Sequence, residues 1–314
     1  MEQKKILIYG AGVIGSIYAG KFALAGFDVT VLARNARLKE LQEKGLCIKN
    51  NKEERIEIPK IKTISELNEN DIYDFIFVNL HKDQVKNILP SLQKNGSQNI
   101  VFMVNTSSGY DEWISSVGKS RVIPAFPGAG GLLKDGVVYY QITSKLVQPT
   151  TLGEIGGAKT PRLKALSAIL EKSGFPIEIS GNMDGWQKTH VAMMCPLVNV
   201  VFYDGGTNYS VAKNPEAINQ MNLALKEGFR FLKESGIGIV PSKLSFLLYC
   251  PIWILNRMIK LAYNTKWAET VISTPALASP HDYEMMSADF VKFAAEKNYD
   301  LVEFKKLMHP QNKK

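Results

Sequence analysis

The sequence predicts an α/β fold: an N-terminal Rossmann domain with a mostly parallel sheet, followed by an all-helical C-terminal domain. Three observations predict it. Short apolar runs alternate with helical patterns in the first half, and a glycine-rich turn follows the first run directly. After Gly181 the strand patterns stop and long helical periodicities replace them. A chain of 314 residues can bury two cores, and we place the boundary near residue 180, with domains 1–180 and 181–314.

The elements of the first domain follow from apolar runs and from glycines that end helices. Gly26 and Gly45 each end a predicted helix, because glycine readily adopts the left-handed conformation of a helix end. The predicted strands are 6–9, 29–32, 75–79, 100–104, 136–143, 150–155 and 176–179, and the predicted helices are 13–25, 36–44, 82–93 and 160–172. We expect 136–143 and 150–155 to form a later, antiparallel extension of the sheet.

Two helix starts are visible in the second domain. Asn214 before Pro215 is an N-cap with proline at the first helical position, and Gly236 ends that helix. Ser279 begins a second helix, where the pattern resembles a capping box with Asp282 in place of glutamate.

Composition and charge exclude several classes of protein. The chain is 45% hydrophobic and 22% charged, as in ordinary globular proteins, and its net charge of +8 is spread out except at the tail Lys313–Lys314. Cys47, Cys195 and Cys250 form no CxxC motif, which favours free thiols in a reducing compartment. The N-terminus has no signal-peptide pattern, so we expect a cytoplasmic protein. No spacing indicates a metal site or a nucleic-acid recognition module.

One strongly apolar segment, residues 244–255, requires a check for membrane insertion. It is shorter than the roughly 20 residues that a spanning helix needs, so we expect no membrane partner. A buried helix, the wall of a substrate pocket and a subunit contact remain open for it, and with the last of these a homodimer.

The glycine-rich turn predicts a dinucleotide site. Its residues are Gly10, Ala11, Gly12, Val13, Ile14 and Gly15, placed between the first strand and the first helix. Gly10 permits a tight turn, Gly12 lets the backbone approach a pyrophosphate, and Gly15 lets helix and strand pack closely. The amides at the helix N-terminus then face the phosphates.

The end of the second strand distinguishes NADP from NAD. A carboxylate that would accept the ribose hydroxyls is absent there, and Arg34 stands in its place, with Arg37 one turn later. A guanidinium group binds a phosphate through two parallel hydrogen bonds, so the sequence predicts NADP(H). The alternative is that the arginines are merely solvated, above all Arg37.

Beyond these motifs the chain resembles the ketopantoate reductases. The resemblance rests on the GAGVIGS turn, Arg34, Asn105 after a strand, and three further stretches: Pro127 to Gly131, Gly153 to Gly156, and Trp186-Gln187-Lys188. It implies a Rossmann domain joined to a helical domain that act on a 2-oxo acid or a related carbonyl compound.

The resemblance also implies roles for individual residues. Lys188 would be the general acid and Asn105 would lie beside the nicotinamide and substrate. Glu284 would help to hold the substrate and the lysine, and His81 or Lys82 would meet a substrate carboxylate or a cofactor phosphate. Carbonyl reduction creates an alkoxide, which a positioned ammonium both stabilises and protonates. The alternative for Lys188 is a surface lysine on an amphipathic helix.

This sequence departs from the family at the substrate. The family has asparagines four and eight positions after the lysine, where this chain has Ala192 and Pro196. Asn199 returns to a similar helical face and is a candidate replacement. We therefore expect an NADPH-dependent reductase whose substrate is unidentified. Two alternatives remain open: a non-catalytic NADP(H)-binding redox sensor or regulator, and reduction of ketopantoate itself with the missing amides replaced from elsewhere.

Overall fold

The structure is a computed structural model that describes residues 3–308, except the side chains of Pro275 and Ala278. His309 and the Lys313–Lys314 tail lie outside the described residues. The chain divides into two compact units. Unit 1 consists of Met1–Val104 and Tyr110–Met183, and unit 2 consists of Asn105–Gly109 and Asp184–Lys314. The short loop Asn105–Gly109 thus groups with the helical unit, although it follows a strand of unit 1.

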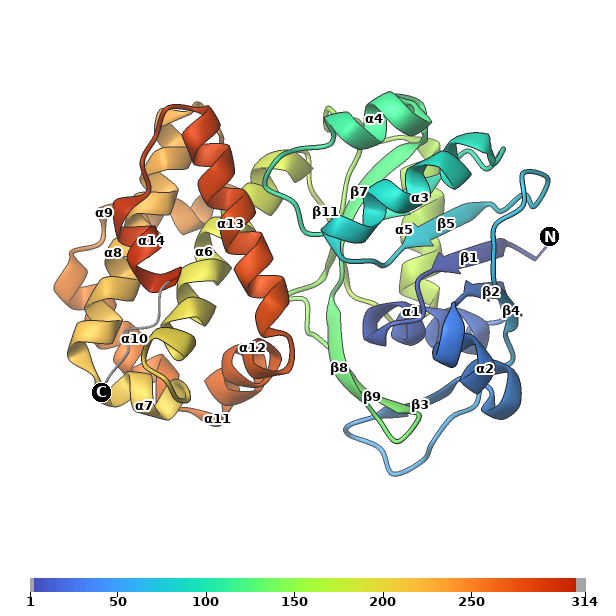
Figure 1. Cartoon of the computed structure of the whole chain (residues 1–314), viewed down its shortest axis with the longest axis horizontal. Coiled ribbons are helices and arrows are strands. Elements are labelled where there is room, and N and C mark those ends of the chain that lie inside the picture. The colour runs from blue at the N-terminus through green and yellow to red at the C-terminus, as the bar shows by residue number, and fades with distance from the viewer. Residues whose placement is uncertain (1–2, 309–314) are drawn as a thin grey trace. The chain divides into compact units, whose positions relative to one another are not determined.

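Unit 1 contains the strands and the first five helices (Figure 1). The strands are β1 Lys5–Tyr9, β2 Asp28–Leu32, β3 Cys47–Asn50, β4 Lys62–Ile64, β5 Phe75–Val78, β6 Ile100–Phe102, β7 Val122–Phe126, β8 Ala129–Lys134, β9 Val137–Ile142, β10 Thr150–Leu152 and β11 Ile177–Ile179. The helices are α1 Val13–Leu24, α2 Asn35–Lys44, α3 Lys82–Lys94, α4 Asp111–Val117 and α5 Pro161–Lys172, with the 3-10 turn η1 Lys119–Arg121.

The regular elements in the described part of unit 2 are all helices. Its elements are α6 Met183–Tyr203, α7 Asn208–Lys213, α8 Pro215–Glu234, η2 Ser242–Ser245, α9 Phe246–Tyr249, α10 Ile252–Tyr263, α11 Lys266–Ala268, the π-helical η3 Glu269–Ser273, α12 Thr274–Ala278, α13 Pro280–Glu296 and α14 Val302–Met308.

The main sheet has eight strands in the order β11-β10-β7-β6-β5-β1-β2-β4. All neighbours pair in parallel except β7 and β10, which are antiparallel. The predicted α/β class with a mostly parallel sheet is therefore confirmed. The order reverses between β1 and β5, and such a switch point is where open parallel sheets bind ligands, at the carboxyl ends of the strands.

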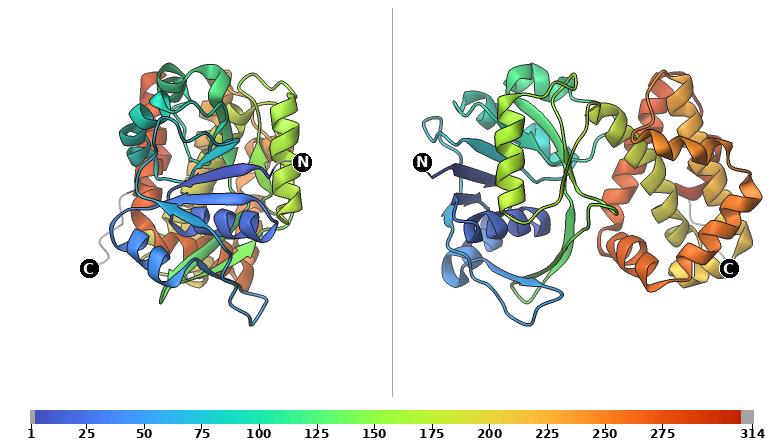
Figure 2. Two further views of the ribbon diagram at one scale, coloured as in Figure 1. Left: turned by 90° about the vertical axis from the view of Figure 1, so that its right-hand side faces the viewer. Right: turned by 180° about the vertical axis from the view of Figure 1, so that it is seen from behind.

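Both faces of this sheet are covered, which explains why its central strands β5 and β6 are apolar throughout. Ile6, Ile8 and Phe77 face one way and pack with α1 and α5, whereas Leu7 and Val78 face the other way and pack with α3 and α4. The alternation follows the two-residue period of a strand. Figure 2 shows from two further sides how the helices flank the strands in this unit.

A second, three-stranded sheet has the order β3-β9-β8. It packs on α1, which also contacts β1 and β2 of the main sheet. The expectation for residues 136–143 was therefore half right: β9 exists, but it belongs to this small sheet and does not extend the main one. The other expected extension is confirmed, because β10 pairs with β7 in antiparallel register.

The caps in unit 2 correct one prediction and confirm another. The Asn214 side chain accepts hydrogen bonds from the amides of Glu216 and Ala217, and Pro215 is the first residue of α8, as predicted. Ser279 precedes α13, but its side chain caps no amide. The expected capping box at Ser279 is therefore wrong, since the backbone there (φ −140°, ψ 60°) departs from the extended conformation usual for a capping residue.

Candidate functional site

The glycine turn of unit 1 follows β1 at the switch point of the sheet. Gly10 has φ +112°, which side-chain-bearing residues rarely adopt, and a Cβ there would overlap the Asn79 carbonyl oxygen. A Cβ at Gly15 would overlap the Gly10 carbonyl oxygen, so helix and turn can approach this closely only with glycine. At Gly12 the space beyond the backbone is open. The turn is thus closed on its protein side and open where a ligand would lie.

Two further features fit an anionic dinucleotide at this turn. Helix α1 begins at Val13 and has no acidic residue in its first turn, so its free amides and positive partial charge face outward unopposed. At the end of β5, the Asn79 side-chain oxygen is buried and has no hydrogen-bond partner among residues 3–308. A buried acceptor without a donor is costly, and a ligand hydroxyl or amide at the switch point would satisfy it.

Arg34 and Arg37 occupy different positions although they are three residues apart. Arg34 lies exposed at the junction of β2 and α2, where its guanidinium is 3.5 Å from the Tyr9 hydroxyl. Arg37 is not merely solvated, as one alternative held. It donates to the Ala11 carbonyl at 3.2 Å and to the Ser16 hydroxyl at 3.1 Å, and it pairs with Glu40. Arg37 therefore braces the glycine turn, and Arg34 keeps its charge on the surface beside it.

His81 and Lys82 lie at the start of α3, directly after β5. His81 is the exposed residue that precedes the helix, and Lys82 is its first residue and is half-buried. They follow β5, the strand that neighbours β1 at the switch point. Both are thus in unit 1 together with the glycine turn.

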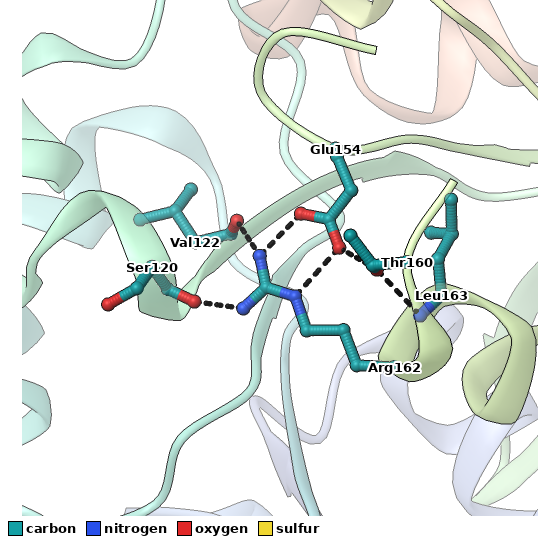
Figure 3. Close-up of polar contacts among 6 residues, drawn as sticks. All are labelled: Ser120, Val122, Glu154, Thr160, Arg162 and Leu163. Carbon is teal, nitrogen blue, oxygen red and sulfur yellow. Dashed lines mark hydrogen bonds and ion pairs between the residues drawn. The ribbon is translucent and has the colours of Figure 1, made fainter. Parts of the chain in front are cut away.

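The Gly153–Gly156 stretch has a structural role in unit 1. Glu154 is buried and forms an ion pair with Arg162, which also binds the backbone carbonyls of Ser120 and Val122 (Figure 3). The Thr160 hydroxyl donates to the same carboxylate. Burial alone would raise the pKa of Glu154, but the hydrogen bonds and the charge of Arg162 outweigh it and lower the pKa.

In unit 2, Lys188 lies on α6 and is only 7% exposed, so it is not a surface lysine. Its Nζ donates to both carboxylate oxygens of Asp184, at 2.6 and 2.5 Å, one helical turn earlier. The same ammonium lies 4.9 Å from the centre of the Phe293 ring. The Asp184 side chain is 41% exposed, so it connects a buried ammonium to solvent.

The loop Asn105–Gly109 lies beside this ion pair within unit 2. A Cβ at Gly109 would be 3.7 Å from the Asp184 carboxylate. Asn105 is exposed, as a ligand-binding amide would be, whereas the buried Ser107 hydroxyl has no partner. The structure thus places the predicted asparagine in the same unit as Lys188.

Asn199 and Glu284 have other neighbours than the Lys188 ammonium among the described contacts. The Asn199 amide is buried and donates to the Ser287 hydroxyl at 2.9 Å. Glu284 is exposed on α13, with His281 4.0 Å away, and the carboxylate bonded to Lys188 belongs to Asp184 instead. His190, which follows Lys188 by two residues, stacks on Trp186, and burial lowers its pKa to about 4.

Ala192 explains one departure from the family pattern. It is fully buried, and its methyl group faces Gly228 of α8 closely enough that a Cβ on the glycine would be 3.4 Å away. An asparagine amide has no room at this helix crossing. Pro196 lies inside α6, which continues past it to Tyr203.

Sequence reasoning missed Asp184, Phe293 and Asn79. Asp184 had a usable signal, because a carboxylate four residues before a lysine on a helix pairs with it. Phe293 and Asn79 had none, since each meets its neighbour only through the tertiary fold.

A chain with this parallel sheet, glycine turn and switch-point geometry belongs to the class of dinucleotide-binding oxidoreductases. The model of the ketopantoate reductase PanE/ApbA family matches residues 6–155. The 2-dehydropantoate 2-reductase of Pyrococcus horikoshii is 24% identical over 254 residues, 78% of each chain. Over its N-terminal half the chain is thus similar to the ketopantoate reductase family, and it is similar at low identity to a curated 2-dehydropantoate 2-reductase over most of its length.

Solved structures have the same fold at low identity. A PanE/ApbA family ketopantoate reductase from Ralstonia eutropha has a TM-score of 0.76 at 16% identity, covering 97% of this chain and 96% of its own. A D-mandelate dehydrogenase, solved with NADH and anilino(oxo)acetate, has a TM-score of 0.77 at 16% identity with the same coverage.

Proposed function

We propose that this protein is an NADPH-dependent reductase of a 2-oxo acid or a related ketone, in which Lys188 is the general acid. The observation that supports it most is the buried Lys188 ammonium, held by two hydrogen bonds to Asp184, in a chain that also has a dinucleotide turn. Similarity to the ketopantoate reductase family supports the reaction class. The D-mandelate dehydrogenase with the same fold was solved with NADH and anilino(oxo)acetate, which supports a nicotinamide cofactor and an oxo acid substrate.

The cofactor half of the proposal uses the residues of unit 1. The amides from Gly12 onward bind the pyrophosphate, and Arg34 binds the 2′-phosphate that distinguishes NADPH from NADH. His81 and Lys82 supply positive charge or donors to the phosphates or to a substrate carboxylate. When bound, the reduced nicotinamide supplies the hydride, and Asn105 orients the reacting groups with its neutral amide.

The proton is delivered by Lys188. As the carbonyl carbon gains its C–H bond, the C=O π electrons move to oxygen, which takes a proton from the lysine Nζ and becomes the alcohol. Asp184 and the Phe293 ring hold the ammonium in one direction before the reaction, which spares the cost of ordering it. Asp184 then guides a replacement proton from solvent to the neutral amine. Asn199 and Glu284 are not needed for this step, and the proposal leaves them a part in substrate binding only.

The substrate differs from ketopantoate in this proposal. The packed contact between Ala192 and Gly228 leaves no place for an amide that would hold polar substrate groups. We therefore favour a 2-oxo acid with a less polar side chain.

The test is a titration with NADPH and NADH, followed by NADPH oxidation over a panel of 2-oxo acids that includes ketopantoate. Tight NADPH binding with oxidation of one class of acid supports the proposal. Binding without oxidation of any carbonyl compound contradicts it and favours the cofactor-binding sensor, for which the loss of the family asparagines is the motivating observation. No binding of either nucleotide would overturn both.

A further inference from the structure

The apolar segment of unit 2 packs on the core with part of its residues and exposes several large apolar side chains. From η2 to α10 the chain forms two helical segments, Ser242–Tyr249 and Ile252–Tyr263. The bend between their axes is 117°. Trp253 is 66% exposed, and Tyr249 and Leu261 are each 69% exposed. Core packing, which is the commonest use of such a stripe, therefore does not explain these side chains.

Polar anchors hold this bent pair firmly against α8. The Lys226 ammonium donates to the carbonyls of Leu248 and Cys250, at 2.8 and 2.7 Å, and so fixes the turn between the two segments. Asn256 of α10 exchanges side-chain hydrogen bonds with Asn219 and Asn222 of α8. The outward side chains are thus presented by a supported element and not by a frayed end.

The opposite edge of α10 is held as well. Leu255 and Tyr263 are buried, and the Tyr263 hydroxyl donates to the Leu197 carbonyl of α6. Helix α10 packs on α8 and α7 (Figure 1). Its inward face is therefore packed, whereas its outward side chains stay exposed within the described residues.

The outward face combines apolar and basic side chains. Trp253, Arg257, Lys260 and Leu261 are spaced by four, three and one residues, which places them on one side of the helix, and all four are exposed. We call this surface, together with Phe246, Tyr249 and Trp267, the α9–α10 face. Aromatic side chains can enter an apolar layer while long basic side chains beside them reach anionic groups at its surface. The face therefore suits an interface between an apolar layer and an anionic one.

The charge of the α9–α10 face selects its occupant. From Glu234 to Glu269 the intervening chain has no acidic residue and four basic ones, namely Lys243, Arg257, Lys260 and Lys266. A second copy bound by twofold symmetry would place this basic face against itself, and like charges repel. A surface of anionic lipid offers phosphates to the basic groups and a headgroup layer to the aromatic ones.

We propose that the α9–α10 face docks on the surface of an anionic lipid bilayer, with the axis of α10 parallel to the membrane. Among the described helices no single one is long and apolar enough to cross a membrane, and the sharp bend between the two segments suits a helix lying in the headgroup layer. Trp253 and Leu261 enter the headgroup region, and Arg257 and Lys260 bind lipid phosphates. This inference is independent of the proposed reaction.

The experiment is co-sedimentation of the full chain with vesicles of phosphatidylcholine alone or mixed with phosphatidylglycerol. We expect binding to the mixed vesicles and little to the neutral ones. Arg257→Gln with Lys260→Gln should weaken that binding about 30-fold, from the usual contribution of a basic residue near an anionic surface. Trp253→Ser with Leu261→Ser should also release the protein, and brominated lipids should quench the tryptophan fluorescence of the parent more than that of this variant.

Matched controls separate the face from general basicity and apolarity. Lys164→Gln with Lys297→Gln removes the same charge from exposed sites elsewhere, and Leu24→Ser with Val302→Ser removes exposed apolar groups elsewhere. Both controls should bind as the parent does, and circular dichroism should show that every variant is folded. Absence of binding to mixed vesicles, or equal loss in the controls, overturns the proposal. So does a dimer in light scattering that only Trp253→Ser with Leu261→Ser dissociates, because the face would then join two copies.

Discussion

In the proposed reaction, Lys188 and Asp184 of one helix act together, the lysine as the proton donor and the aspartate as its partner. The lysine is buried while its partner is half-exposed, so the ammonium keeps its direction and still has a link to solvent. An unpaired buried ammonium would be costly, and Asp184 offsets that cost.

Lys188→Ala should therefore abolish turnover, by 100-fold or more in kcat, because it removes both the proton and the charge. Asp184→Asn should slow turnover less, since the lysine stays but loses its orientation. Binding of NADPH, followed by fluorescence, should be unchanged in both variants. Lys297→Ala, on an exposed position of the same unit, serves as the control. A Lys188→Ala enzyme with the parent's kcat would refute the assignment.

Arg34 determines cofactor preference in the proposal. Arg34→Ala should weaken NADPH binding about 10- to 100-fold, the range for a hydrogen bond to a charged group, and leave NADH binding nearly unchanged. Titrations of both nucleotides measure this directly. Lys39→Ala, an exposed residue of the same helix, is the control. If Arg34→Ala binds the two nucleotides as the parent does, the 2′-phosphate lies elsewhere.

At the scale of elements, substitutions at two glycines of the turn should affect different properties: Gly12→Ala should affect cofactor binding and Gly15→Ala should affect folding stability. Gly12→Ala adds a methyl group to open space, so the protein should fold normally, while the methyl group keeps the pyrophosphate from the backbone. Gly15→Ala places its methyl group against the Gly10 carbonyl, which is backbone and cannot rotate away, and should lower stability by about 3 kcal/mol.

Urea unfolding and NADPH titration of the two variants test this distinction. The expected results are parent-like stability with lost binding for Gly12→Ala, and a lowered unfolding midpoint for Gly15→Ala. Tight NADPH binding by Gly12→Ala would show that the pyrophosphate does not lie against this turn.

The Glu154–Arg162 ion pair joins α5 to the end of η1 and the start of β7, and it makes unit 1 sensitive to acid. Because the folded state lowers the pKa of Glu154, its contribution is complete above the unfolded value of 4.5 and is lost as the pH falls through the lowered folded pKa. Glu154→Gln should reduce stability at pH 7 by about 3 kcal/mol and flatten the decline of stability in acid.

Thermal unfolding from pH 7 downward measures both effects. Glu43→Gln, which removes an exposed pair with Lys39, should change little. A Glu154→Gln protein that loses stability in acid as steeply as the parent would contradict the role of this pair.

At the scale of the whole molecule, each unit has its own apolar core. The glycine turn, Arg34, His81 and Lys82 lie in unit 1, whereas Asn105 and the predicted general acid Lys188 lie in unit 2. A ligand that binds the folded chain stabilises it by mass action. NADPH at about 100 times its dissociation constant should add ~2.7 kcal/mol to stability, and calorimetry should show a raised unfolding temperature. The Gly12→Ala variant should show no such rise; an equal rise in that variant would mean that NADPH binds away from the turn.

Much of unit 1 could be predicted because its signals are local. The glycine turn and the apolar runs each depend on residues adjacent in sequence, as does the Asn214 cap in unit 2. Strands β3, β4, β7 and β8 were missed, although Asp135-Gly136, both with positive φ, is a usual two-residue hairpin signal between β8 and β9. The capping box at Ser279 failed because residue types alone do not determine the backbone angles at that position.

Local patterns in the chain were thus enough for the fold class and the position of the glycine turn, and the family resemblance supplied Lys188 as the candidate acid. The burial of Lys188, its contact with Phe293 and the bracing of the turn by Arg37 depend on packing between distant segments. The outward exposure of the α9–α10 face depends on packing in the same way. An apolar run is equally compatible with a core and with a surface, and only the anchors from Lys226 and Asn256 decide which side of α10 faces out. Hydrophobic pattern reports what can be buried, whereas the tertiary contacts determine what is.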